Sequence, residues 1–341
     1  MNLLKSRYLL KHEGKVFELP QDLYLTVSLL LALPEKKNQR LKVAKEFYHA
    51  LASRKLSPGT PVILNLRRPN GNLASCFITA MDDSLDSIYY TLDQLAQISK
   101  NAGGVGVNIS RLRSHGASIK GIKGASGGVL PWVKLINDTA VAVNQLGSRS
   151  GAITVAIDSW HRDIEDFLDM QTENGDQRKK SFDVFPQMVV TDVYMKRVES
   201  NKSWTLVDPH EVKKKLGYDL AVLYGDDFEK AYAKVEESPE LEFKKKIPAR
   251  ELFKTYLKSL VETGMPYLFF KDTTNDMNPN KHCGMIGNAN LCTESFSNFS
   301  PTVMGPKELN PKKDHVSQNM KAGETHTCNL VSLNFAEVTD E

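Results

Sequence analysis

The chain has 341 residues, of which 41% are hydrophobic and 25% are charged, and its formal net charge is only +3. These values indicate a globular protein of about two domains with a large core, and the near-neutral charge argues against direct nucleic-acid binding. No apolar run approaches the roughly 20 residues of a membrane span. Residues 1–15 lack the apolar core and cleavage site of a secretory signal, so we expect a cytoplasmic protein.

The first part of the chain is expected to be helical, with a domain boundary after residue 58. Helices are predicted near 21–33 and 39–55, because apolar residues recur there at helical spacing. Residues 60–64 and 76–78 are predicted to form short buried strands on either side of a turn at 69–72.

Helices and strands alternate through the middle of the chain. Helices are predicted at 83–101, 131–146, 161–171 and 251–263, and strands at 153–157, 182–191 and 267–270. The charged segment 199–250 is expected to be a solvated helical excursion, and 300–324 a mobile hairpin or loop.

Residues 103–128 are rich in glycine and carry Arg111 and Arg113. Such backbone can approach a phosphate closely while the cations neutralise it; a flexible surface loop is the alternative. Gly104-x-Gly106 lacks the third glycine of the dinucleotide-binding fingerprint, which weakens a dehydrogenase interpretation.

Residues 287–294 place three chemically active groups at every second position: Asn290, Cys292 and Glu294. In an extended segment these side chains would share one face. A neighbouring carboxylate opposes ionisation of a thiol, so Cys292 is predicted to act as S–H. A buried structural cysteine is the alternative interpretation.

The chain has four cysteines, Cys76, Cys283, Cys292 and Cys328, and no Cys-x-x-Cys pair. A zinc site built from the His282-Cys283 and His326/Cys328 clusters has unfavourable spacing. We therefore expect no metal in this chain and regard Cys283 as a bystander.

Six motifs, in order along the chain, resemble the large catalytic subunit of ribonucleotide reductase, most closely the aerobic class I form. They are Ser75-Cys76, Asp83–Ile88, Ala102–Asn108 with Arg111–Arg113, Arg149–Ala152 with Trp160-His161, Asn290-x-Cys292-x-Glu294, and Cys328–Leu330. The resemblance implies an α/β fold in which residues 59–341 form the first half of a ten-stranded α/β barrel. This part would include specificity loops, a finger loop at about 287–296 and the first strand of the second half, and a helical segment, 1–58, would precede it.

The resemblance also implies roles for individual residues. Cys292 would carry a thiyl radical, Glu294 would take a proton from the substrate, and Asn290 would bind the ribose hydroxyls. Cys76 and Cys328 would be the reducing pair and should therefore lie close together. Thr60 and Ser75 would bind substrate, and Asp83, Arg113 and Arg149 would bind or sense the effector.

The implied partners are a dNTP or ATP as specificity effector, a dinuclear-metal small subunit as the radical source, and thioredoxin or glutaredoxin as reductant. The large subunit is expected to be dimeric. From the resemblance we expect the chain to lack the family's ATP cone and to hold only the first half-barrel, with a second polypeptide supplying the other half. The alternative is that an intron, intein or frameshift ended the chain soon after Cys328. The alternatives are a nucleotide-binding regulatory module and a class II cobalamin-dependent reductase.

Overall fold

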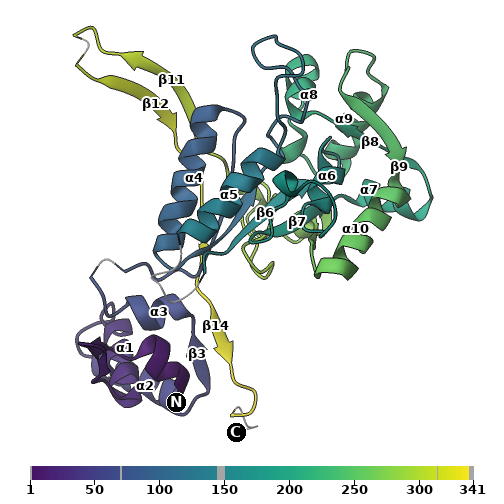
Figure 1. The fold of residues 1–341 in the computed structure, drawn as a ribbon. Coiled ribbons are helices and arrows are strands. Elements are labelled where there is room, and N and C mark those ends of the chain that lie inside the picture. The colour runs from purple at the N-terminus through teal and green to yellow at the C-terminus, as the bar shows by residue number, and fades with distance from the viewer. Residues whose placement is uncertain (1, 70, 144–149, 313, 338–341) are drawn as a thin grey trace.

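The computed structural model describes residues 2–69, 71–143, 150–312 and 314–337. Its N-terminal part is a small helical unit, drawn in purple at one end of the molecule in Figure 1. This unit contains the π-helical turn η1 (Leu4–Tyr8), the short hairpin β1 (Lys11–His12) and β2 (Lys15–Val16), and the helices α1 (Pro20–Leu31), α2 (Arg40–Ala52) and α3 (Thr60–Asn65). The two helices predicted near 21–33 and 39–55 are confirmed.

Residues 60–64 form helix α3, so the strand predicted there is wrong. Gly59 precedes the helix and Pro61 lies in its first turn, where a missing N–H and a fixed φ favour helix initiation. The apolar run Val62–Leu64 suits either structure over so short a length. Val62 packs into the small core of the helical unit with Leu23 and Leu51.

A six-stranded sheet in the order β10-β7-β6-β5-β4-β13 forms the centre of the molecule. Its five parallel strands are β4 (Cys76–Ala80), β5 (Gly104–Asn108), β6 (Ile153–Asp158), β7 (Phe185–Val190) and β10 (Tyr267–Phe270), and β13 (His326–Cys328) runs antiparallel to β4. The five parallel strands, preceded by the helical unit, are the expected first half-barrel, and this fold prediction is confirmed. That β13 is the first strand of the second half stays a prediction.

Helices cover one face of this sheet, as parallel connections require (Figure 1). They are α4 (Leu85–Lys100), α5 (Leu130–Ala142), α6 (Ile164–Asp169), α7 (Asp192–Glu199) and α10 (Ala249–Thr263), and the short helix α11 (Lys271–Asp276) directly follows β10. Ser84 begins α4, since its hydroxyl accepts a hydrogen bond from Ser87 N. The predicted helix at 131–146 is present as α5, although its last predicted turn lies outside the described residues.

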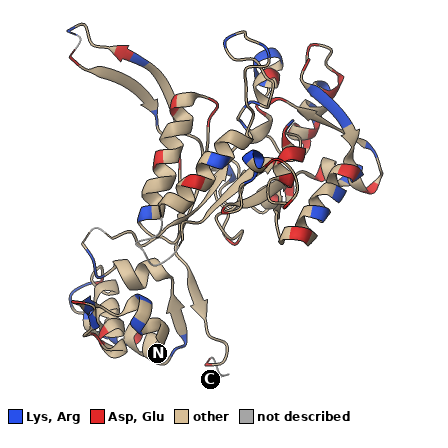
Figure 2. Ribbon diagram, in the orientation of Figure 1, with Lys and Arg blue, Asp and Glu red and all other residues tan. Residues whose placement is uncertain are grey.

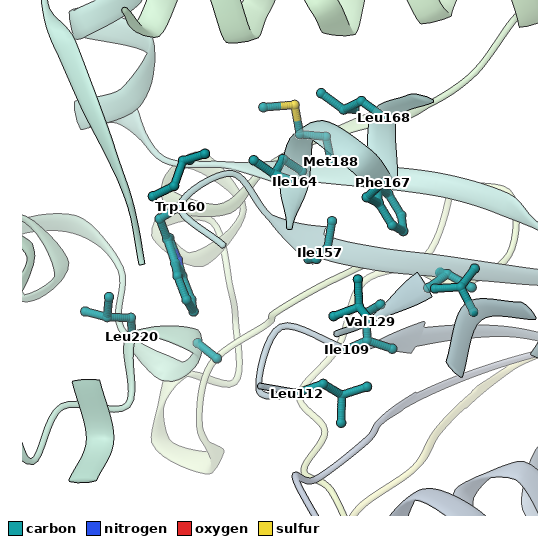
Figure 3. Packing of buried hydrophobic residues seen from close by; sticks show 14 of the residues in the cluster. Ile109, Leu112, Val129, Ile157, Trp160, Ile164, Phe167, Leu168, Met188 and Leu220 are labelled. Atoms are coloured by element: carbon teal, nitrogen blue, oxygen red, sulfur yellow. The ribbon is translucent and has the colours of Figure 1, made fainter. Parts of the chain in front are cut away.

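The main hydrophobic core lies between the sheet and these helices. Val105, Val155 and Met188 point into it from three neighbouring strands and are fully buried. Figure 3 shows part of this core, where Ile157 and Met188 from the sheet lie near Ile164 and Phe167 of α6. Residues at the intervening strand positions face the opposite side of the sheet, because successive side chains alternate.

The prediction that residues 199–250 form a solvated helical excursion is wrong, because the segment forms strands and helices with buried side chains. The segment contains β8 (Ser203–Val207) paired with β9 (Lys244–Pro248), the helices α8 (Pro209–Leu216) and α9 (Gly225–Glu237), and the 3₁₀ turn η3 (Leu220–Val222). Trp204 and Tyr232 are fully buried and stacked, with ring centroids 4.3 Å apart. Figure 2 shows why the sequence suggested a solvated segment: charged residues are frequent along these elements and sparse on the central strands.

The predicted hairpin in 300–324 is confirmed as β11 (Val303–Leu309) and β12 (Val316–Lys321), which project beside α4 (Figure 1). After β13, the strand β14 (Val331–Leu333) returns to the helical unit and pairs with β3 (Leu56–Pro58). The remaining short turns are η2 (Gln177–Lys179) and η4 (Lys281–Cys283). Among the described residues, no helix combines the length and apolar character needed to span a bilayer.

Candidate active site

A narrow loop, residues 287–296, lies against the face of the sheet that the helices leave uncovered. We call it the finger loop. Ala289 and Phe296 pair across its base, and Asn290 N donates to Ser295 O at 3.2 Å. Between them the chain turns sharply, and Thr293 has a left-handed φ of 64°. The extended conformation expected for 290–294 is therefore wrong, because the chain doubles back at this point.

Two glycines in β5 make room for the finger loop. A Cβ atom at Gly106 would lie 2.1 Å from the backbone oxygen of Ala289, and one at Gly104 would lie 2.4 Å from Leu291. Both distances are below any real Cβ contact, so a side chain at Gly106 would displace the loop backbone, and one at Gly104 would displace the Leu291 side chain. These two glycines thus provide space for the finger loop rather than a phosphate cradle.

Polar side chains on the same face hold the finger loop in place. Gln187 accepts from Ala289 N at 3.3 Å and donates to Thr293 Oγ1 at 3.0 Å, so one amide joins both sides of the loop. Thr154 donates to Leu291 O at 2.6 Å. Gln187 and Thr154 are fully buried.

The base of the loop is fastened by Asn275 of α11, which exchanges two 2.8 Å hydrogen bonds with the backbone of Ile286. The sequence analysis missed Asn275, Gln187 and Thr154. The available signal was the position of Thr154 and Gln187 as polar residues inside largely apolar strands.

Four of the predicted catalytic residues, two of them on the finger loop, meet where the loop approaches β4 and β13. Cys328 lies directly opposite Cys76 in the register of β13 and β4. The Sγ atoms of Cys76 and Cys328 and a carboxylate oxygen of Glu294 all lie within 4.8 Å of one another. Asn290 Nδ2 donates to Glu294 Oε1 at 2.6 Å, and Glu294 N donates to Asn290 Oδ1 at 3.1 Å.

The predicted proximity of the two cysteines is confirmed. Directly opposed residues of an antiparallel pair have Cα atoms about 4.5–5.5 Å apart, which lies inside the range of about 4.4–6.8 Å that disulfides span. Neither Cys76 nor Cys328 is in a disulfide in this structure.

The surroundings of Cys76 keep its sulfur protonated. The pKa of the Cys76 thiol is raised to about 12, chiefly by burial; a hydrogen bond with Asn290 lowers it, and the nearby Cys328 and Glu294 contribute to the rise. Cys76 is therefore a thiol at neutral pH. Partial burial also lowers the pKa of His326, whose Nε2 lies 3.1 Å from Ser295 Oγ.

A cavity of about 630 Å³ opens next to this cluster, between the helical unit and the sheet. Thr60, Ser75, Cys76 and Cys292 all line it. Thr60 Oγ1 lies 3.0 Å from the Tyr8 hydroxyl. Ser75 Oγ is buried and has no hydrogen-bond partner among the described residues, so it is available to a ligand in the cavity.

Two of the predicted effector residues form a separate site beyond the carboxyl ends of β4 and β5. Arg113 Nη2 lies 2.8 Å from Asp83 Oδ2, and His210 Nδ1 lies 3.4 Å from the same oxygen. These residues line a second cavity, of about 290 Å³, together with Arg111 and other charged residues. Arg149, the third predicted effector residue, lies outside the described residues.

Residues 74–341 match the family model described as ribonucleotide reductase, barrel domain, and residues 1–71 match ribonucleotide reductase, all-alpha domain. The ribonucleoside-diphosphate reductase subunit alpha of Synechocystis sp. is 51% identical over 98% of this chain. Proteins of the same name from Treponema pallidum and Helicobacter pylori strain J99 are 39% and 37% identical over 99% of it. The chain spans 41%, 40% and 46% of these three relatives.

The raised pKa of Cys76 predicts slow alkylation. At pH 8 a thiol of pKa about 12 holds about 1,000-fold less thiolate than one at the ordinary value of 9.0. Iodoacetamide labelling followed by peptide mass spectrometry should show Cys76 lagging far behind the exposed Cys283. Glu294→Gln removes a nearby negative charge and should speed the labelling of Cys76, whereas Glu308→Gln on the projecting hairpin should not. Equal labelling rates for Cys76 and Cys283 at pH 8 would contradict this account.

The two hydrogen bonds from Gln187 to the finger loop predict that Gln187→Leu loosens the loop. Leaving the Ala289 N–H unpaired costs about 1–3 kcal/mol, so hydrogen exchange at that amide should accelerate by about 5- to 150-fold. The Ile286 amide, held separately by Asn275, serves as an internal control, and Gln318→Leu on the hairpin is the matched substitution. Unchanged hydrogen exchange at the Ala289 amide would show that Gln187 does not hold the finger loop.

Proposed function

This chain belongs to the large-subunit family of ribonucleotide reductases, and from that premise we propose that it forms part of an enzyme that reduces ribonucleotides to 2′-deoxyribonucleotides. The observation that supports this most strongly is the meeting of Cys76, Cys328 and Glu294 within 4.8 Å. Two adjacent thiols are a two-electron reductant, and the neighbouring carboxylate can accept or donate a proton. A site that only bound nucleotides would have no use for this combination.

The electrons and protons of the overall reaction balance between the two cysteines and the ribonucleotide. Cys76 and Cys328 together give up two electrons and two protons and become a disulfide. The ribonucleotide loses its 2′-hydroxyl as water and gains hydrogen at C2′. The thiol form of Cys76, which its surroundings maintain at neutral pH, is the form that can supply the proton.

The initiating group in this proposal is Cys292. It would lose one electron and one proton to an oxidant supplied by a dinuclear-metal small subunit, and the resulting thiyl radical would remove the hydrogen atom from C3′. Glu294 would take the 3′-hydroxyl proton. Asn290 already holds the Glu294 carboxylate at 2.6 Å and would also orient the ribose hydroxyls.

The cavity beside Cys292 is the proposed substrate site. Thr60 and Ser75 both line it and offer hydroxyl groups. The unpartnered Ser75 Oγ would donate to a phosphate or ribose oxygen. A ribonucleotide in this cavity would reach both Cys76 and Cys292.

The site around Asp83 and Arg113 is the proposed effector site. Arg113 would bind the triphosphate of a dNTP or ATP and Asp83 its ribose, which requires their 2.8 Å ion pair to rearrange. Arg149 would relay the identity of the effector to the substrate site.

Catalysis would also need protein beyond these residues. The family's barrel has ten strands, whereas the sheet here has six. We therefore propose that the remaining half-barrel completes the site, either from a second polypeptide or from the same one. A dimeric large subunit, the small subunit and thioredoxin or glutaredoxin would complete the cycle.

The runner-up is a regulatory module that binds effector nucleotides without catalysis. The paired charges at Asp83 and Arg113 favour a regulatory module, but such a module leaves the meeting of Cys76 and Cys328 unexplained. A class II cobalamin-dependent reductase would use the same cysteine cluster with a different radical source.

Two variants separate catalysis from effector binding. In the enzyme reconstituted with the rest of the large subunit and the small subunit, Cys292→Ala should lower turnover by at least ~10⁴-fold, the scale of losing a catalytic nucleophile. Its dNTP affinity should be unchanged. Arg113→Ala should instead weaken dNTP binding by about 10- to 150-fold, since a charge-assisted hydrogen bond contributes about 1.5–3 kcal/mol.

Arg178→Ala, which removes an exposed arginine on η2, is the control and should alter neither property. Turnover that survives in Cys292→Ala would refute the radical mechanism. Effector binding to an assembly that never turns over in the unsubstituted form would favour the regulatory module.

A further inference from the structure

The thiol cluster has a second chemical capacity that the proposed reaction does not use. Cys76, Cys328 and Glu294 present two sulfurs and one carboxylate oxygen within 4.8 Å of one another. Among the described residues this is the one group of three or more potential ligands that could close around a single ion. We propose that, in its reduced state, this cluster binds a thiophilic divalent cation of the Zn²⁺ class.

The spacing of the ligand atoms fits such an ion. Zn²⁺ binds thiolate sulfur at about 2.3 Å and carboxylate oxygen at about 2.0–2.2 Å in tetrahedral geometry, which sets a sulfur and an oxygen ligand roughly 3.5 Å apart. Cys76 Sγ and Glu294 Oε1 are 3.8 Å apart. Closing that gap needs a movement of a few tenths of an ångström.

The surroundings supply the outer contacts that a metal site needs. Asn290 Nδ2 donates to Glu294 Oε1 at 2.6 Å, and the Asn290 carbonyl accepts from Glu294 N, so the carboxylate is held from two directions. Ligating carboxylates in proteins are themselves hydrogen-bonded in this way.

The ion also has a way in. Cys76 is buried but lines the 630 Å³ cavity, Cys328 is half-buried, and Glu294 is exposed. Three protein ligands leave one position of a tetrahedral ion open to water.

Binding is an exchange of protons for metal and involves no redox change. Cys76 and Cys328 each release a proton from sulfur, one ion takes the place of both protons, and Glu294 contributes its carboxylate. Two anionic sulfurs and a carboxylate facing one another repel, and a divalent cation between them removes that repulsion.

This proposal departs from the expectation that the chain holds no metal. That expectation rested on cysteine spacing along the sequence, and the ligands here come from β4, β13 and the finger loop. The consequence for activity rests on the proposed function. An ion bound to both sulfurs prevents them from forming a disulfide, so it would inhibit reduction reversibly.

The test uses the protein in its native assembly, reduced, freed of metal and kept anaerobic, and titrated with Co²⁺. We expect sulfur-to-cobalt charge-transfer absorption that saturates at one ion per chain and is displaced by Zn²⁺. Cys76→Ser and Cys328→Ser should each weaken binding by more than the 10- to 100-fold that losing an outer contact costs. Asn290→Ala should weaken Co²⁺ binding by 10- to 100-fold. Cys283→Ser, which removes an exposed cysteine outside the cluster, should leave Co²⁺ binding unchanged.

A second measurement guards against variants that fail to fold. Oxidation of the unsubstituted protein to the Cys76–Cys328 disulfide should abolish the cobalt absorption, and reduction should restore it. Absorption that persists after oxidation or in the Cys76→Ser/Cys328→Ser double variant would overturn the proposal, and so would its loss in Cys283→Ser. An active reductase without this absorption would disprove only the metal site. Co²⁺ binding by an assembly that shows no turnover before cobalt is added, with the small subunit in its metal-loaded form, would disprove only the proposed function.

Discussion

The close approach between the finger loop and strand β5 is the constraint on which the rest of the site depends. Gly104 and Gly106 leave the strand bare on the side that faces the loop, and a Cβ at Gly106 would come within 2.1 Å of the loop backbone. The loop can therefore lie flat against the sheet, where Thr154 and Gln187 bond to it. Without this space, Asn290 and Glu294 would not reach the cysteine pair.

The second requirement is the antiparallel pairing of β13 with β4. This register puts Cys328 opposite Cys76, although the two lie far apart in the sequence. The site around Asp83 lies at the other end of β4, no more than about 25 Å along an extended chain from Cys76. The proposed catalytic and effector sites thus share one rigid strand, and β5 contributes Gly104 near one site and leads to Arg113 near the other.

Local patterns predicted the elements with long periodic segments and failed where the chain is short or turns sharply. Helix α4 was predictable because Ile88, Leu92 and Leu95 recur at helical spacing and are buried as expected. Helix α3 was not, because its six residues are too few to show a period. The Asn-x-Cys-x-Glu motif drew attention to the finger loop, but no local signal revealed the left-handed conformation of Thr293 that folds it back. The family resemblance predicted the meeting of Cys76 and Cys328, which no spacing rule could have supplied.

The most direct test of the account is a single turnover. The complete enzyme would be reduced, freed of external reductant and given one equivalent of ribonucleotide, and its cysteine peptides would then be mapped by mass spectrometry without reduction. The account predicts one new disulfide, between Cys76 and Cys328, in proportion to the deoxyribonucleotide formed. Deoxyribonucleotide formed with both of these cysteines still reduced, or with a disulfide that involves Cys283 instead, would contradict it.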